Sequence, residues 1–123
     1  MKPILLILVL SFLALPVLKA DDTTQADALF NKLLAAVMAK DYDAFVADGT
    51  VEVKAGIAKS QFDAVASMMD PKLEAGYDVT SLGELNKSGY EVYLYRIRFK
   101  NGADDVEGTL SLKDGKVAGI LYR

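Results

Sequence analysis

The stretch Tyr90-Glu-Val-Tyr-Leu-Tyr-Arg-Ile-Arg-Phe-Lys100 decides the fold of this chain. It consists of β-branched, aromatic and charged side chains and contains no Gly or Pro, which is typical of a β-strand. Asn101-Gly102 follows directly. This dipeptide favours a two-residue hairpin turn, because both residues tolerate positive φ angles. The stretch therefore predicts the central strand of an antiparallel sheet.

The residues on either side of this turn predict the register of the hairpin. A two-residue turn pairs four positions across the strands: Lys100 with Ala103, Arg98 with Asp105, Arg96 with Glu107, and Tyr95 with Gly108. Two of these pairs join opposite charges on one face, which stabilises a sheet. On the other face we expect the Tyr95 ring to cover Gly108. A shift by one residue would lose these contacts.

The register sorts the side chains into an inner face, against which we expect helices to pack, and an outer face. The inner face is mostly apolar: Tyr93, Tyr95, Ile97, Phe99, Val106, Leu110 and Leu112. The outer face mixes apolar positions with charged pairs: Tyr90, Val92, Leu94, Arg96, Arg98, Asp105, Glu107, Thr109 and Ser111. Ile120 and Tyr122 join the outer face if the Asp114-Gly115 turn has two residues. That turn would place Lys113 opposite Lys116, so a bulged turn is the alternative.

Turn residues divide the second half of the chain into four segments with strand-like alternation. These segments span 77–85, 90–100, 103–113 and 116–122. Alternation of this kind indicates half-buried strands. Thr50-Val-Glu-Val-Lys54 also alternates and would add a short fifth strand. The sheet is therefore predicted to be a four-stranded antiparallel meander, or a five-stranded one with this addition.

The first half of the chain has the apolar spacing of helices. Thr24, with Asp27 three residues on, can cap a helix. The apolar stripe of that helix repeats at intervals of three and four residues: Ala26, Leu29, Phe30, Leu33, Leu34, Val37 and Met38. Asp41 can cap a second helix and Ser60 a third, which we expect Pro71 to interrupt. The predicted fold class is α+β, with N-terminal helices packed on the sheet.

The first twenty residues have the pattern of a signal peptide. Lys2 precedes an apolar run from Ile4 to Leu15, and the small residue Ala20 offers a cleavage point. A membrane anchor is the alternative, but the run is shorter than the roughly 20 apolar residues of a membrane span. We expect residues 1–20 to be removed. Residues 21–123 would then form one exported domain, periplasmic or secreted, with no membrane attachment.

The charge of the chain and its missing residue types exclude several classes of function. Without Lys2 and Lys19, Lys and Arg number 12 against 17 Asp and Glu, so residues 21–123 carry a net charge of −5. A nucleic-acid partner would favour a basic face instead. The absence of Cys and His excludes disulfides, a Ser-His-Asp triad and a zinc site of the ordinary type. We therefore predict no cofactor, no metal and no nucleic-acid partner.

Two phrases near the ends of this predicted topology resemble the nuclear-transport-factor-2-like superfamily. Ala39-Lys-Asp-Tyr-Asp-Ala-Phe-Val46 is similar to the helix-to-helix junction of that superfamily, and Lys113-Asp-Gly-Lys-Val-Ala-Gly-Ile120 is similar to its closing hairpin. The resemblance covers residues 25–122 and points to small exported members of uncharacterised function. It implies a cone-like, cystatin-like domain whose sheet curls around the long helix. It also implies dimerisation through the outer face, as in many relatives, or a pocket inside the cone.

Two sets of residues are candidates for binding. Residues of the cone interior can orient a small apolar ligand, with an ordinary aromatic core as the alternative: Tyr93, Tyr95, Thr80, Asp78 and Glu91. Residues of the outer face can form an interface, with a surface salt-bridge ladder as the alternative for the two arginines: Tyr90, Val92, Leu94, Arg96 and Arg98. Glu84 and Glu91 face each other near the hairpin tip if residues 86–89 form a four-residue turn. Paired carboxylates can supply a general acid, and simple solvation of both is the alternative.

These observations lead to three hypotheses about function. We expect an exported, non-enzymatic domain that acts by protein association or homodimerisation through the outer face. The alternative is a domain that binds a small molecule in the cone cavity. An isomerase- or dehydratase-type enzyme is the third hypothesis. Enzymes of the resembled superfamily commonly use His, or Asp with Tyr, inside the cone, and because this chain has no His we assign no catalytic residue.

Overall fold

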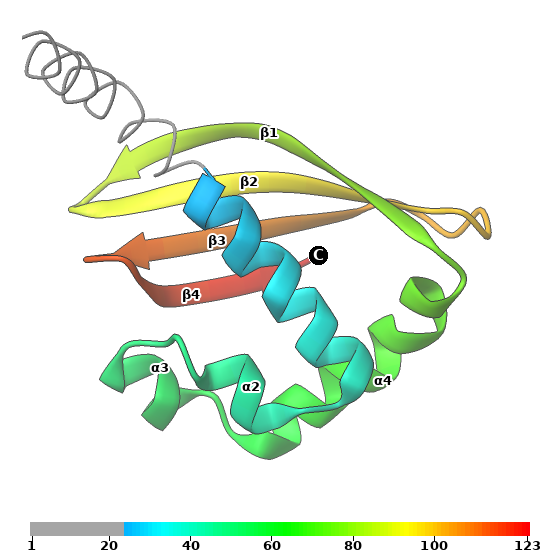
Figure 1. Ribbon diagram of the computed structural model, residues 1–123, viewed down its shortest axis with the longest axis horizontal. Helices are drawn as coiled ribbons and strands as arrows, with labels where there is room; N and C mark the ends of the chain where they lie inside the picture. The colour runs from blue at the N-terminus through cyan, green and yellow to red at the C-terminus, as the bar shows by residue number, and fades with distance from the viewer. Residues whose placement is uncertain (1–23) are drawn as a thin grey trace, which may run out of the picture.

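The computed structural model describes residues 24–123, and in them helices pack on an antiparallel sheet (Figure 1). A long helix spans residues 24–39, followed by α2 (Tyr42–Val46), α3 (Val51–Gly56) and α4 (Lys59–Glu74). The strands are β1 (Tyr77–Lys87), β2 (Tyr90–Phe99), β3 (Val106–Lys113) and β4 (Lys116–Tyr122). The predicted α+β fold class is confirmed. The predicted signal peptide lies outside the described residues, and none of the described helices is long and apolar enough to span a bilayer.

The strands lie in the order β1-β2-β3-β4, so each strand pairs with its neighbours in the chain. The predicted register between β2 and β3 is confirmed by two of the predicted pairs: Arg96 opposite Glu107, and Tyr95 opposite Gly108. The ladder stops at Ile97 opposite Val106, before the predicted Lys100–Ala103 pair. The connection between β2 and β3 is therefore longer than a two-residue turn.

The β1–β2 hairpin is tighter than predicted. Lys87 pairs with Tyr90, so the turn consists of Ser88 and Gly89, which both have positive φ angles of 54° and 86°. Such a turn matches the twist of the paired strands. The predicted four-residue turn is wrong, because Asn86 and Lys87 continue β1. A bulge between Ser81 and Gly83 adds a further shift of register within β1.

β4 follows a two-residue turn, but its faces differ from the prediction. Lys113 pairs with Lys116, and their repulsion is limited because both side chains are exposed. A shift of register between Ser111 and Leu112 then reverses the alternation of faces along β4. Ile120 lies opposite Leu110 and Tyr122 opposite Gly108. Both residues therefore lie on the inner face, and their predicted place on the outer face is wrong.

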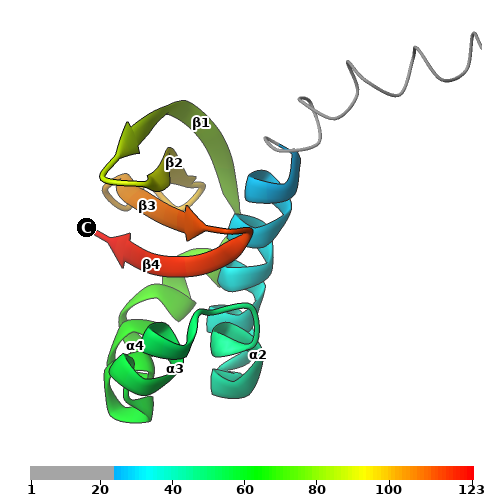
Figure 2. The same ribbon diagram turned by 90° about the vertical axis from the view of Figure 1, so that its left-hand side faces the viewer.

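The helix of residues 24–39 crosses the inner face of the sheet (Figures 1 and 2). The Phe30 ring stacks on Tyr95 at 4.1 Å between ring centroids. A Cβ atom built on Gly108 would lie 2.5 Å from Cζ of Phe30. The ring that fills the space over this glycine is therefore Phe30, whereas the sequence predicted Tyr95. All of the predicted inner-face residues are buried.

The segment 50–54 forms a helix, and its prediction as a strand is wrong. The hydroxyl of Thr50 accepts a hydrogen bond from the Val53 backbone N–H at 3.2 Å. An acidic residue in the first turn of α3 and a basic residue in its last turn suit the helix dipole. Val51 is 78% exposed and Val53 only 8%. The two valines, whose alternation suggested a strand, therefore lie on two sides of one short helix.

The cap of α4 also differs from the prediction. The backbone N–H of Ala58 donates to the Gln61 side chain at 3.0 Å, whereas Ser60 lies inside the helix. Pro71 was expected to interrupt this helix, but α4 continues to Glu74. Pro71 has no backbone N–H, so the carbonyl four residues before it has no helical partner. Pro71 is exposed and lies close to the end of the helix, where water can reach that carbonyl.

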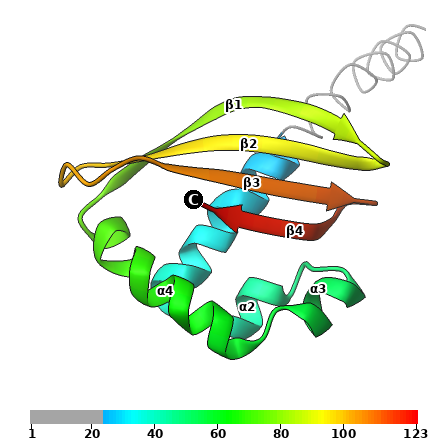
Figure 3. The same ribbon diagram turned by 180° about the vertical axis from the view of Figure 1, so that it is seen from behind.

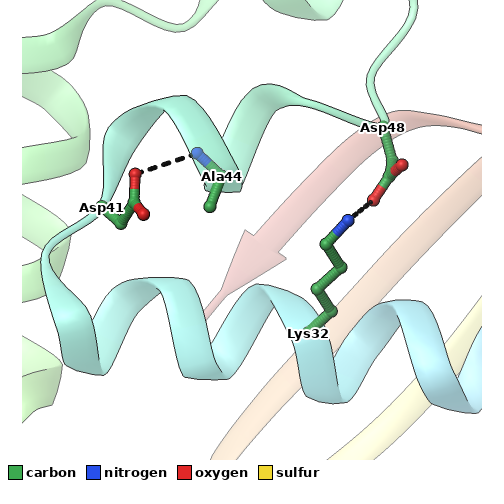
Figure 4. A network of polar contacts seen from close by, with 4 residues as sticks. All are labelled: Lys32, Asp41, Ala44 and Asp48. Carbon is green, nitrogen blue, oxygen red and sulfur yellow. Dashed lines mark hydrogen bonds and ion pairs between the residues drawn. The ribbon is translucent and has the colours of Figure 1, made fainter.

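The loop between α2 and α3 is attached to the free edge of β4. The Thr50 N–H donates to the Val117 carbonyl at 2.9 Å, and the Val117 N–H donates to the Asp48 carbonyl at 2.8 Å. Lys32 of the long helix forms an ion pair with Asp48 at 2.6 Å (Figure 4). Figure 4 also shows the predicted cap of α2, in which an Asp41 oxygen accepts from the Ala44 N–H at 3.1 Å.

Candidate interface on the outer face of the sheet

The outer face of the sheet is not covered by the helices of the described chain. Seen from behind in Figure 3, the strands lie in front of the long helix, and α2, α3 and α4 lie beyond the β4 edge. Four apolar residues cross the middle of this face and form the apolar band: Leu85, Val92, Leu94 and Leu121. Leu85 is 48% exposed and Leu121 52% exposed. The band takes its residues from β1, β2 and β4, and Thr109 of β3 lies between Leu94 and Leu121.

A charged end lies on one side of the band. Its residues come from β1, β2, the start of β3 and the C-terminus: Asp78, Arg96, Arg98, Asp105, Glu107 and Arg123. Nε of Arg98 lies 3.6 Å from an Asp105 oxygen, and Nε of Arg123 lies 2.8 Å from a Glu107 oxygen. The four side chains of these two ion pairs are 39–69% exposed, so each pair contributes only about 0–1 kcal/mol.

A lysine end lies on the other side of the band. Lys87, Lys113 and Lys116 gather there around Tyr90, where the hairpin turns bring neighbouring strands together. The Lys113 ammonium lies 5.2 Å from the centroid of the Tyr90 ring, a favourable cation–π geometry. The outer face therefore carries three zones along the strands, which are charged pairs, apolar residues and lysines.

The predicted interface residues all lie on this face, in all three zones. Tyr90 belongs to the lysine end, Val92 and Leu94 belong to the apolar band, and Arg96 and Arg98 belong to the charged end. Val92 is only 9% exposed. Leu85 and Leu121, which supply the exposed apolar surface, were missed by sequence reasoning. The two-residue turn between β1 and β2 places Leu85 on this face, and the bulge in β4 places Leu121 there.

The predicted ligand-binding residues do not come together. Tyr93 and Tyr95 are buried on the inner face. Asp78 lies opposite Arg98 and Thr80 opposite Arg96, so both belong to the outer face, and their prediction as inner neighbours of the tyrosines is wrong. The reason is that Tyr77 pairs with Phe99, which places the odd residues of this part of β1 inside.

The two carboxylates of the predicted acid–base pair are also separated. Glu84 lies opposite Tyr93, and Glu91 lies opposite Asn86, because the hairpin turn is two residues long. Both glutamates are exposed. The prediction that they face each other is therefore wrong. In residues 24–123 no cluster of three or more acidic side chains could hold a metal ion.

One polar contact inside the fold was not predicted. The Tyr95 hydroxyl donates to an Asp27 oxygen at 2.8 Å, beside a cleft of about 140 Å³ that Asn31 and Ser81 also line. Burial, and then the contact with Asp27, raise the pKa of Tyr95 above its ordinary value of 10. In the sequence Asp27 indicated only a helix cap. Its position three residues before Phe30, on the same side of the helix, was the available signal.

Comparison with known protein families and with curated proteins does not indicate what this chain does. No model of a known protein family matches the chain. The search of curated proteins also gives no match. Function is therefore inferred from the residues and contacts described above.

Proposed function

We propose that this chain is an exported, non-enzymatic domain that forms a homodimer through the outer face of its sheet. The observation that carries the proposal is the apolar band at the centre of a face that no described helix covers. Apolar residues in the centre and charged residues around them are the usual anatomy of a protein interface. The proposal also includes membership of the cone-like superfamily that the sequence resembles, in which many members dimerise through this face.

The packing of the inner face favours the association hypothesis over the binding of a ligand at Tyr93 and Tyr95. Tyr95 is 2% exposed and stacks on Phe30. The cleft beside its hydroxyl measures about 140 Å³, below the roughly 300–1,000 Å³ of typical small-molecule sites. The side chains of the long helix thus occupy the space that a ligand in the middle of the inner face would need.

The arrangement of the three zones favours a second copy of the same chain as the partner. A two-fold axis that runs along the apolar band, across the strands, stacks the band of one copy on the band of the other. The same rotation lays the lysine end of each copy over the charged end of its partner, where acidic and basic side chains are equal in number. An axis parallel to the strands would instead bring the lysines of both copies together, which is unfavourable.

The test is the mass of the exported protein in solution across a concentration series, measured by sedimentation velocity. We expect a dimer for the natural sequence. Leu121→Lys places a charge in the apolar band and should weaken dimerisation by at least about tenfold. The matched control is Val51→Lys, because Val51 is the more exposed residue, at 78%, and belongs to α3.

Two outcomes would refute the homodimer. One is a natural protein that stays monomeric at the highest concentration. The other is a dimer that Leu121→Lys leaves intact while Val51→Lys dissociates it, which would place the interface on the helical side. Circular dichroism of both variants checks that each one is folded.

A further inference from the structure

Asn101 and Gly102 lie in the exposed connection between β2 and β3. The β2–β3 ladder stops at Ile97 opposite Val106, so this connection lies outside the pairing that holds the two strands together. A covalent change at Asn101 or Gly102 can therefore take place without breaking the ladder.

An asparagine followed by a glycine can modify itself in water. The backbone nitrogen of the glycine loses its proton to a base from the solvent and attacks the side-chain carbon Cγ of the asparagine. A succinimide ring closes, and the side-chain amide nitrogen takes up a proton and leaves as ammonia. Glycine favours this attack because it has no Cβ to obstruct the nitrogen. Water then opens the ring at either carbonyl, which gives aspartate or isoaspartate.

The Asn101 side chain is folded back toward the backbone that follows it. Its Oδ1 accepts a hydrogen bond from the Ala103 backbone N–H at 3.0 Å, an arrangement in which the side chain mimics a backbone turn. Negative charge develops on Oδ1 when the Gly102 nitrogen attacks Cγ, and a backbone N–H aimed at that oxygen stabilises the charge. The Ala103 N–H is therefore placed to assist ring closure in the folded chain.

The backbone of Gly102 is weakly held. Its N–H donates to the Phe99 carbonyl at 3.4 Å, which is longer than the roughly 2.7–3.2 Å of ordinary N–H···O hydrogen bonds. Beyond its chain neighbours, no heavy atom lies within 4 Å of the position that a Cβ of Gly102 would take. The loop therefore has room for the movement that ring closure requires.

The two other asparagines of the chain stand in a different setting. Asn31 lies in the helix of residues 24–39, and Asn86 lies in β1. A lysine follows each of them, so a side chain crowds the nitrogen that would have to attack. Ring closure would also break the regular backbone of the helix or strand. Asn31 and Asn86 thus serve as internal controls.

We propose that Asn101 is a self-modification site, at which the folded chain converts to aspartate and isoaspartate. Conversion to aspartate adds one negative charge to a loop that already holds Asp104 and Asp105. Conversion to isoaspartate adds the same charge and also inserts the side-chain carbon into the backbone, which lengthens the loop. The apolar band takes no part in this chemistry, so this proposal and the homodimer can fail independently.

The test follows all three asparagines in one sample of the folded protein, which is kept in neutral buffer and digested at intervals at mildly acidic pH. Mass spectrometry detects each conversion because OH replaces NH₂, and chromatography separates aspartate from isoaspartate peptides. We expect Asn101 to convert at least about tenfold faster than Asn31 and Asn86. In urea the rate at Asn101 should stay level or fall, whereas the rates at Asn31 and Asn86 should rise.

Three variants separate the chemistry of the dipeptide from the contribution of the fold. Gly102→Ala crowds the attacking nitrogen and should slow conversion about tenfold, both in the folded chain and in urea. Asn101→Gln keeps an amide but would need a larger ring, so it should stay unmodified. Ala103→Pro removes the N–H that bonds Oδ1, and it should slow conversion about fivefold in the folded chain only.

Circular dichroism checks that each variant is folded. If Ala103→Pro does not fold, the comparison of the natural chain with and without urea still tests the contribution of the loop.

Three results would overturn the proposal. One is an Asn101 amide that lasts as long as those of Asn31 and Asn86 in the folded chain. Another is conversion of Asn101 that is much faster in urea, which would mean that the folded loop protects this residue. The third is an Ala103→Pro variant that folds and converts at the natural rate, because the Ala103 N–H would then contribute nothing.

Discussion

The inner and outer faces of this sheet are built from alternate residues of the same strands, yet they differ in what completes them. On β2 the inner residues Tyr95 and Ile97 are at most 2% exposed, because the long helix packs on them. The outer residue Arg98 is exposed, and so is Asp105, with which it forms an ion pair. The comparison indicates that the inner face contributes most of the stability, while much of the outer face is exposed.

The largest expected effect comes from removing the ring that joins helix and sheet. Phe30→Ala should lower the free energy of unfolding by about 3–5 kcal/mol, because a fully buried aromatic ring leaves a cavity. Urea unfolding followed by circular dichroism measures this loss. Leu85→Ala, on the outer face, should cost clearly less. If the two variants lost equal stability, the assignment of stability to the inner face would be wrong.

The next effect comes from adding a methyl group beneath the same ring. Gly108→Ala should cost about 1–3 kcal/mol through overpacking, because its Cβ would lie 2.5 Å from Phe30 Cζ. The control is Gly119→Ala in the neighbouring strand, where the nearest atom would be 3.8 Å away. Its free energy of unfolding should stay level or rise. Combining Gly108→Ala with Phe30→Leu should recover part of the loss.

Alkaline pH should lower the free energy of unfolding through the tyrosines of the inner face. Burial raises the pKa of Tyr95 and Tyr122 in the folded chain, so the unfolded chain loses these protons first, near pH 10. Stability is therefore complete below about pH 10 and falls at higher pH, by about 1.4 kcal/mol per pH unit for each tyrosine. Urea unfolding at several pH values measures the slope.

Replacing either of these tyrosines by phenylalanine should reduce the alkaline slope. Tyr90→Phe, on the outer face, provides the comparison. A slope that all three variants leave unaltered would mean that other groups determine the alkaline behaviour.

The smallest expected effect belongs to the charged end of the outer face. Arg98→Ala should change the free energy of unfolding by about 0–1 kcal/mol, because its ion pair with Asp105 is exposed. A double-mutant cycle with Asp105→Ala, repeated at about 1 M salt, should show a coupling that salt removes. A coupling that persists at high salt would mean that this pair is more buried in solution than the isolated chain suggests.

The central hairpin could be predicted because local chemistry and long-range pairing agree there. The opposite charges of Arg96 and Glu107 and the alternation of apolar residues select one register, and the structure has it. The long helix and its buried stripe were predictable for the same reason, since a 3.6-residue period appears only when one side faces a core.

The remaining errors arise at two kinds of position. A bulge residue changes which face of the sheet the following strand residues occupy, and a capping side chain changes where a helix starts. The bulge in β4 moves Tyr122 to the inner face, a position that the turn residues of the sequence did not reveal. The cap at Thr50 turns a strand-like pattern into α3. The contact between Asp27 and Tyr95 joins residues far apart in the chain, and the local spacing of Asp27 and Phe30 indicated only that both lie on the same side of the helix.

Growth into fibres requires a flat strand edge with free backbone groups. At β4 the loop residues Asp48 to Thr50 already occupy such groups through Val117. At β1 the bulge between Ser81 and Gly83 interrupts the regular spacing that an added strand would have to match. These two edge features would limit polymerisation through the strand edges and leave the outer face as the surface for the proposed dimer.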